Sequence, residues 1–499
     1  MSRRASKVAA LLIQLSVLPF AGCKDETTPV SDAGSPQAGE DASAAGSGGA
    51  GSSAAGSGGS GGAAGKAGAG GKPSAAGGGG GGSGGGAGHA AEASVERASI
   101  AADDQPKIED SAYSALVAQL NKLGLELGQR QAEANKLTDK NVVYSPLSAS
   151  IALSMTYAGA RGQTATEFAE LLSAGMPADT YHAGVNRLIR ELASRAQDGK
   201  DSAGNPRKIE LNIADAVYLD KQLNVGAEFL NELARNYDTG VHREDFRHAF
   251  EDSRMHINDW VAGETHDKIQ NLLPQGALND MTRLVLVNAL YFYGSWLNTF
   301  NPMATSPADF HTLADQTVSV PTMVRQGGLR YSTGADFAAV QLPYVGDHLS
   351  MLVVVPNDGK FESVRKAVTS DWLKSVIDAG AQRTVRLALP KFKMTVGAFS
   401  LSDSLEAMGL ETAFSDKADF TGISSDEPLQ ISSVVQKAFI SVDENGTEAA
   451  AATAVTVGTT SAPVDIVELN VDRPFLFFIR DDSAAVLFSG QVVDPSKQE

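Results

Sequence analysis

The sequence predicts an α+β domain that follows a long unfolded segment. Three observations support this prediction. Apolar residues recur at helical spacing near residue 116, short β-prone stretches are common further on, and residues 27–102 consist mostly of Gly, Ala and Ser. Because helical and strand patterns alternate irregularly after residue 105, an α+β fold is favoured over a parallel wound sheet.

The helical patterns come first in the domain. Ser145 is predicted to cap a helix, since its side chain can accept a hydrogen bond from a free amide of the first turn, and Pro146 suits that turn. Gly159 ends this helix, and a short helix is predicted over 164–172. An earlier amphipathic helix is predicted from leucines at a spacing of three to four residues, namely Leu116, Leu120, Leu123 and Leu127.

The strand patterns occupy most of the remaining domain. The stretch 281–292 is strongly apolar and predicts a central strand with a buried Asn288. A turn at Gly346 and Asp347 predicts a hairpin, and Asp481 with Asp482 predicts a closing one. The other predicted strands, in order, are 211–219 (interrupted by Asn212 and Asp215), 338–342, 349–355, 385–389, 431–441, 475–480 and 485–493.

Composition divides the chain into three parts. Residues 1–22 are predicted to be a signal peptide, residues 23–105 a flexible linker too poor in apolar surface to fold, and residues 106–499 the domain. The net charge of −18 argues against nucleic acid as a partner. We expect a soluble acidic domain, acting as a monomer.

Cys23 is the single cysteine, so neither a disulfide framework nor a cysteine-based metal site is predicted. Basic residues precede an apolar run over 8–20, which is too short to span a bilayer and is typical of a secretory signal. The ending at Gly22-Cys23 resembles a bacterial lipoprotein signal, in which the cysteine is lipidated. We therefore expect a domain anchored at the bacterial cell surface or in the periplasm. Ordinary cleavage, which would leave an extracellular protein with a free thiol, is the alternative.

The most informative stretch lies near the C-terminus. A charged turn with a glycine at 446 is followed by small and β-branched residues, and positions 449–457 contain neither a charged residue nor a proline. Alternate residues from Thr447 onward are uncharged and can all face a core, as a strand requires. Alanine packs poorly in a sheet, so the segment is predicted to be able to become a strand without being one at rest. The hinge residues are Glu444, Gly446, Thr447, Glu448, Ala449 and Ala450.

Catalytic and metal-binding patterns are missing from the sequence. There is no His-Glu-x-x-His pair and no Gly-x-Ser-x-Gly turn between a predicted strand and a helix, and the Gly/Ser tract near Ser60 belongs to the linker, which cannot hold a nucleophile rigidly. Asp443 to Gly446 lacks the spacing of a calcium loop. We therefore predict no enzyme activity, no cofactor and no metal. A hydrolase with a scattered triad is the alternative that this observation disfavours.

With these segments in place, residues 108–495 resemble the serpin family of serine protease inhibitors. The matching motifs occur in the family's order. They are NVVYSPLS at 141–148, INDWV at 257–261, Thr265 with Lys268-Ile269, LVNALYF at 286–292 with Trp296, LPY at 342–344, LPKF at 389–392, the hinge, RPFLF at 473–477 and GQVV at 490–493.

The resemblance implies three β-sheets, about eight or nine surrounding helices and an exposed reactive loop near the C-terminus. In this family a protease attacks the loop as a substrate, and the cleaved loop then inserts into the largest sheet and traps the acyl-enzyme. The uncharged hinge favours inhibition, because inward-facing residues from Thr447 to Val457 would carry no charge into the sheet. A non-inhibitory binding module with the same fold, displayed at the cell surface, is the alternative.

Family spacing places the reactive bond fourteen residues beyond Gly446, at Thr460-Ser461, with Thr459-Thr460 as a rival. A small uncharged residue there disfavours trypsin-like targets and favours elastase-like or subtilisin-like serine proteases.

Four further positions match structural sites of the family. Ser145, Ser148 and Asn288 match a polar cluster beneath the large sheet where its strands part, and Trp296 matches a tryptophan where the loop enters. Gln436 departs from the family pattern, which has a histidine in the cluster. Tyr293 also departs from it, since a lysine is usual there.

Overall fold

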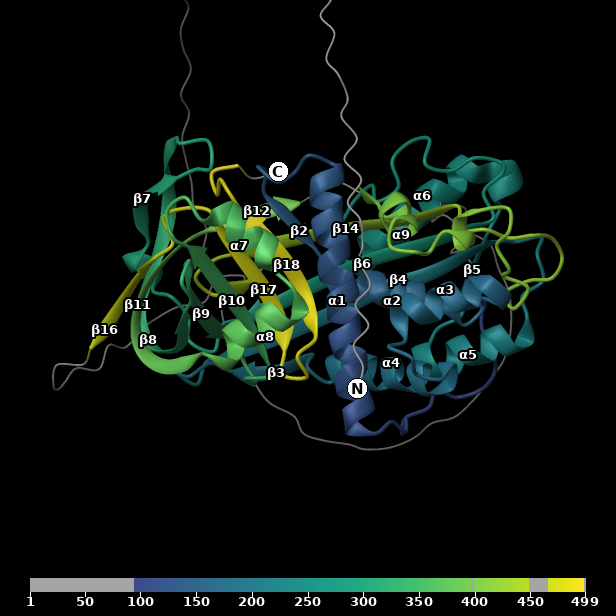
Figure 1. The fold of residues 1–499 in the computed structure, drawn as a ribbon, viewed down its shortest axis with the longest axis horizontal. Coiled ribbons are helices and arrows are strands. Elements are labelled where there is room, and N and C mark those ends of the chain that lie inside the picture. The colour runs from purple at the N-terminus through teal and green to yellow at the C-terminus, as the bar shows by residue number, and fades with distance from the viewer. Residues whose placement is uncertain (1–93, 396–398, 448–464, 498–499) are drawn as a thin grey trace, which may run out of the picture. The chain divides into compact units, whose positions relative to one another are not determined.

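The computed structural model describes residues 94–395, 399–447 and 465–497, all within the unit formed by residues 85–499. Helices and strands alternate irregularly in these ranges, which confirms the α+β prediction. In Figure 1 the long helix α1 lies between the strands that carry the labels β8 to β11 on the left and the helices α2 to α5 on the right.

One sheet, which we call the large sheet, provides the framework of the candidate site. Its strands follow the order β1-β5-β4-β6-β15-β14-β12, with β3 added beside β4 and β13 beside β14. β4 and β6 are antiparallel, whereas β6 and β14 are parallel. The strands are β1 (Val95–Glu96), β3 (Gln197–Lys200), β4 (Pro206–Asp220), β5 (Val241–Glu244), β6 (Leu284–Ser295), β12 (Phe392–Thr395), β13 (Phe399–Ser400), β14 (Ser433–Val442) and β15 (Gly446–Thr447).

A second ladder of strands has the order β16-β11-β8-β9-β10-β17-β18-β2, with β7 beside β8. The resemblance implies two separate smaller sheets here. They are joined because the long strand β8 pairs with β11 through most of its length and with β9 through its last residues. The strands are β2 (Val142–Tyr144), β7 (Ser306–His311), β8 (Thr317–Thr333), β9 (Phe337–Pro343), β10 (Leu349–Pro356), β11 (Ala381–Pro390), β16 (Ile466–Asn470), β17 (Phe475–Asp481) and β18 (Val486–Val492).

Nine α-helices and two short 3-10 helices occur in the described ranges. Ser145 caps α2 as predicted, since its hydroxyl accepts a hydrogen bond from the amide of Ser148 at 3.1 Å. The helices are α1 (Asp110–Ala134), α2 (Pro146–Tyr157), α3 (Gly162–Leu172), α4 (Ala178–Ala193), α5 (Ala227–Tyr237), α6 (Phe246–Glu264), α7 (Phe361–Ala367), α8 (Ser370–Asp378), α9 (Ser402–Glu406), η1 (Pro302–Ala304) and η2 (Thr412–Phe414).

The two faces of β6 belong to different cores, because successive side chains of a strand point to opposite sides. Leu284, Leu286 and Leu290 pack in the main core with residues of α2. Val285 and Val287 pack in a second core with residues of α6. The large sheet is therefore held between α2 on one face and α6 on the other.

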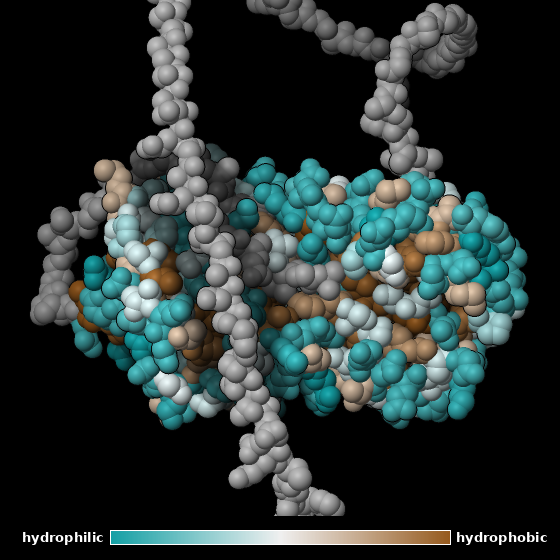
Figure 2. All heavy atoms as spheres, turned by 90° about the horizontal axis from the view of Figure 1, so that it is seen from above, coloured by the Kyte–Doolittle hydropathy of each residue, from teal (hydrophilic) through white to brown (hydrophobic). Residues whose placement is uncertain are grey.

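Helices α7 and α8 cover the second ladder, over β10 and β17 in Figure 1. Figure 2 shows another face of the molecule, where hydrophobic residues are visible mainly in the middle and hydrophilic residues dominate the margins. Among the described residues, no helix combines the length and the apolar character needed to cross a membrane.

The folded part begins earlier than the boundary predicted at residue 106. Residues 95–96 form β1, which pairs with the edge strand β5, and the Arg243 guanidinium lies 2.9 Å from the Glu96 carboxylate. The main-chain amide of Asp103 donates to the carbonyl of Arg235 at 2.9 Å. Composition could not reveal this, because β1 is held by backbone pairing with an edge strand that lies far away in the sequence.

Candidate functional site

The hinge lies at one end of the large sheet, where β15 separates β6 from β14. Thr447 pairs with Val442 of β14 on one side and with Gly294 of β6 on the other. Further along the sheet, β6 and β14 pair with each other directly. The first step in placing a new strand between β6 and β14 is therefore already present in this structure.

A tight turn brings the hinge into this position. The Asp443 carboxylate accepts hydrogen bonds from the amides of Asn445 at 2.8 Å and Gly446 at 3.3 Å. Only glycine fits at position 446, because a Cβ there would lie 2.0 Å from the carbonyl oxygen of Gly294. Glycine is needed here because the main chains of β15 and β6 approach each other closely at this point.

Glu444 ties the turn to the surrounding structure. Its carboxylate accepts hydrogen bonds from the Lys391 ammonium at 2.7 Å and the Thr305 hydroxyl at 2.8 Å. Burial would by itself raise the pKa of Glu444, but the hydrogen bonds from Lys391, Thr305 and the main chain, together with the charge of Lys391, outweigh it and the pKa lies below its ordinary value. The Glu444 carbonyl also accepts from the amide of Phe300 at 2.9 Å.

Two aromatic side chains line the point where the hinge enters. Trp296 stacks on Tyr344 with ring centroids 4.6 Å apart and an interplanar angle of 14°. The Trp296 indole donates to the carbonyl of Asp443 at 3.0 Å, and the Tyr344 hydroxyl is 2.7 Å from that of Thr447. Thr447 is only 1% exposed, so it faces the core as the alternation predicts.

A polar row crosses the large sheet midway along its strands. Asp215, Asn288 and Gln436 are opposite one another on β4, β6 and β14. Asn288 donates to the Asp215 carboxyl at 2.7 Å and accepts from the Gln436 amide at 2.7 Å. Gln436 also donates to the carbonyl of Ser145 at 2.8 Å, and the Ser148 hydroxyl donates to Asp215 at 2.8 Å. The structure thus brings together Ser145, Ser148 and Asn288, the three residues expected to form a cluster.

Asp215 is the member that the sequence prediction missed, since it was interpreted only as an interruption of a strand. One of its carboxyl oxygens is buried without a hydrogen-bond partner, and burial raises its pKa well above the ordinary value. Its partners are uncharged. The alternation of the strand could have revealed it. Ile213 and Val217 face the main core, and Asp215 lies between them on the same face of the strand, so its carboxyl had to be buried.

Comparison with known proteins identifies this arrangement. The sequence profile of the family described as "Serpin (serine protease inhibitor)" matches residues 118–495. Relatives include a serpin-like protein of Thermococcus kodakarensis, 36% identical over 72% of this chain and 81% of its own length. The chain belongs to the serpin family. Human serpin B4 is 34% identical over 72% of this chain and 95% of its own length.

Solved serpin structures show the same fold. A serpin from the insect Tenebrio molitor, described as highly specific, has a TM-score of 0.66 at 30% identity and covers 78% of this chain and 99% of its own. Human thyroxine-binding globulin in complex with its hormone has a TM-score of 0.69 at 29% identity, with coverage of 77% and 100%. A protein described as a serpin and one described as a thyroxine-binding globulin therefore share this framework.

Several predicted site residues lie outside the described residues. These are Cys23, the hinge residues Glu448, Ala449 and Ala450, and the predicted reactive bond Thr460-Ser461. The described part of the hinge includes Glu444, Gly446 and Thr447. Within the described ranges, no cluster of three or more His, Cys, Asp or Glu side chains could hold a metal ion.

Proposed function

We propose that this serpin is a suicide-substrate inhibitor, which traps a serine protease as an acyl-enzyme by inserting its cleaved loop into the large sheet. The observation that carries the proposal is the buried Thr447, which already lies between β6 and β14. A charge-free segment follows it in the sequence, so further insertion would carry no charge into the sheet.

The register supports continued insertion. Thr447 is opposite Gly294 on β6 and Val442 on β14. Six residues further along each strand, Thr453 would be opposite both Asn288 and Gln436. A threonine hydroxyl could then replace the hydrogen bond that these two amide side chains now share, so opening the polar row would leave no polar group unpaired.

The proposed target is an elastase-like or subtilisin-like protease, since the residues at Thr460-Ser461 are small and uncharged. One relative, 35% identical over 71% of this chain and 93% of its own length, is named leukocyte elastase inhibitor A of Rattus norvegicus. We further propose a bacterial lipoprotein that carries this monomeric domain on the linker, with Cys23 as the lipidated residue. The domain would then meet proteases at the cell surface or in the periplasm.

Incubation of the full-length chain with pancreatic elastase, subtilisin and trypsin tests the proposal, with denaturing gels and intact-mass analysis as the readout. We expect a covalent complex with elastase or subtilisin and release of a peptide that begins at Ser461. The matched control is the same protease with its catalytic serine blocked beforehand, which should form no complex. Clean cleavage of the loop by a protease that stays active would instead support a non-inhibitory serpin.

A further inference from the structure

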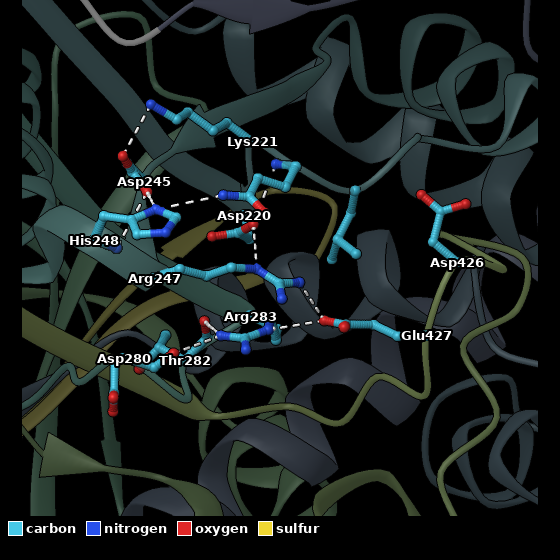
Figure 3. Close-up of polar contacts among 12 residues, drawn as sticks. Asp220, Lys221, Asp245, Arg247, His248, Asp280, Thr282, Arg283, Asp426 and Glu427 are labelled. Atoms are coloured by element: carbon cyan, nitrogen blue, oxygen red, sulfur yellow. Dashed lines mark hydrogen bonds and ion pairs between the residues drawn. The ribbon is translucent and has the colours of Figure 1, made fainter.

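A network of charged side chains lies at the end of the large sheet opposite the hinge. Asp220 is the last residue of β4, Arg247 lies in the first turn of α6, Arg283 directly precedes β6, and Glu427 lies in the segment that leads into β14. We call these four residues the far-end network. Figure 3 shows the two arginines approaching the Glu427 carboxylate from different elements.

The contacts within the network are short. Glu427 accepts from Arg247 at 2.6 Å and from Arg283 at 2.8 Å through the same carboxylate oxygen. Arg247 also donates to Asp220 at 3.0 Å. The side chains of Arg247, Arg283 and Glu427 are 24%, 17% and 32% exposed, and that of Asp220 is fully buried. Partial burial weakens screening by water and salt, so these ion pairs contribute more than exposed pairs do.

The network spans the line along which the sheet must part. β6 and β14 pair directly from Val285 with Ser433 onward. The amide of Ser432 donates to the carbonyl of Leu284 at 3.0 Å, just beyond that pair. A strand inserted between β6 and β14 would move them apart by about 4.8 Å. The contacts of Glu427 with Arg247 and with Arg283 both lie across this line and must then break or rearrange.

The inserted strand would reach the network last. Continuing the register of Thr447 opposite Gly294 places Val457 opposite Leu284, at the start of β6. Val457 is three residues before the predicted bond at Thr460. The hinge end therefore opens first, and the contact between Glu427 and Arg283 is among the last that must give way.

We infer that Glu427, bridging Arg247 and Arg283, resists separation of β6 and β14 and sets the rate of the final stage of loop insertion. This inference rests on the proposed insertion mechanism. It assigns a regulatory role to residues far from the hinge. They keep β6 and β14 together in the uncleaved chain, although β15 already separates these strands at the hinge end.

Uptake of a synthetic peptide with the sequence of residues 448–458, which continues from the chain's own Thr447, by the full-length, uncleaved chain measures sheet opening without a protease. Insertion is followed by the rise in the thermal unfolding temperature of the chain. We expect Glu427→Gln to take up the peptide about fivefold faster, a rate change that corresponds to about 1 kcal/mol. The difference from the parent should shrink as salt is added, because salt screens the ion pairs.

Asp245→Asn is the matched control. Asp245 contacts Lys221 at 2.9 Å and His248 at 3.0 Å at the same end of the sheet, but all three residues lie on the β4, β5 and α6 side of the parting line. Asn also preserves the cap of α6, where the Asp245 carboxylate accepts from the amide of His248. This variant should take up the peptide at the parental rate.

Arg283→Gln removes the arginine of the contact between Glu427 and Arg283. It is a second, independent test of that contact in case Glu427→Gln does not fold. It should accelerate uptake by less than Glu427→Gln does, because the contact between Glu427 and Arg247 remains, and combining it with Glu427→Gln should add little. Parental uptake rates in both single variants, or equal acceleration by Asp245→Asn, would overturn the inference while leaving the proposed function intact. Failure of the peptide to insert into any of the chains would overturn the proposed function, and the inference with it.

Discussion

The two ends of the large sheet differ in how β6 and β14 are held. At the hinge end, β15 lies between them, and Trp296 and Tyr344 hold the turn by uncharged hydrogen bonds. The ion pair of Glu444 with Lys391 at this end joins the turn to the segment before β12, on the β14 side, and does not cross from β14 to β6. At the far end the strands pair directly, and Glu427 bridges two arginines beside them. An uncharged contact with a buried Thr447 can be extended by another uncharged residue, whereas an ion pair must be broken. On the proposed insertion mechanism, the difference predicts that the sheet opens in one direction, from the hinge end to the far end.

Thr447→Arg should give the largest effect, because it acts where opening starts. Arginine would have to bury an unpaired charge beside Tyr344, at a cost of several kcal/mol, or withdraw β15 from the sheet. We expect the covalent complex to fall by about 100-fold or more, with the loop cleaved and the protease active. The ratio of complex to cleaved inhibitor on denaturing gels measures this.

Thr447→Ser is the control for that change, since it keeps the hydroxyl that lies against Tyr344 and should preserve trapping. If Thr447→Arg trapped the protease at the parental rate, the hinge end would not be where insertion begins, and the comparison of the two ends would lose its basis.

Thr453→Val tests the middle of the sheet and should give a smaller effect. Valine has nearly the shape of threonine but no hydroxyl, so the amides of Asn288 and Gln436 would lose their new partner on insertion. We expect insertion to slow by about 30-fold, the rate equivalent of about 2 kcal/mol for two lost hydrogen bonds. The proportion of inhibitor cleaved without complex formation should rise accordingly.

Thr453→Ser restores the hydroxyl and should restore the parental proportion. An unchanged proportion in Thr453→Val would show that the polar row opens without help from the entering strand.

Asp215→Asn should give the smallest effect, and it concerns the closed sheet. The unfolded carboxyl titrates near pH 4 and the buried one at higher pH, so between these values the folded state holds more protons than the unfolded state. Stability of the parent should therefore fall as pH rises through this window. The variant should lose this slope, as measured by urea unfolding of the uncleaved chain from pH 4 to 9.

Asp378→Asn, at an exposed carboxyl beside Lys374, is the control and should keep the parental slope. The same slope in Asp215→Asn would show that the carboxyl of the polar row does not titrate differently in the folded chain.

Local patterns in the sequence were enough to predict the fold class, the serpin family and most of the strands near the hinge. Strong apolar runs such as β6, the hairpin of β9 and β10, and the cap at Ser145 are local patterns, so they can be recognised without knowing what they pack against. The small uncharged residues after Gly446 are local in the same way.

Which polar residues contact one another depends on the tertiary fold. Asp215, Asn288 and Gln436 lie on three strands from distant parts of the chain, and their row exists only because the registers of β4, β6 and β14 align. Glu427 meets Arg247 and Arg283 for the same reason. Register and strand order depend on long-range pairing, which leaves no periodic signal in the sequence, so contacts across strands had to come from the fold.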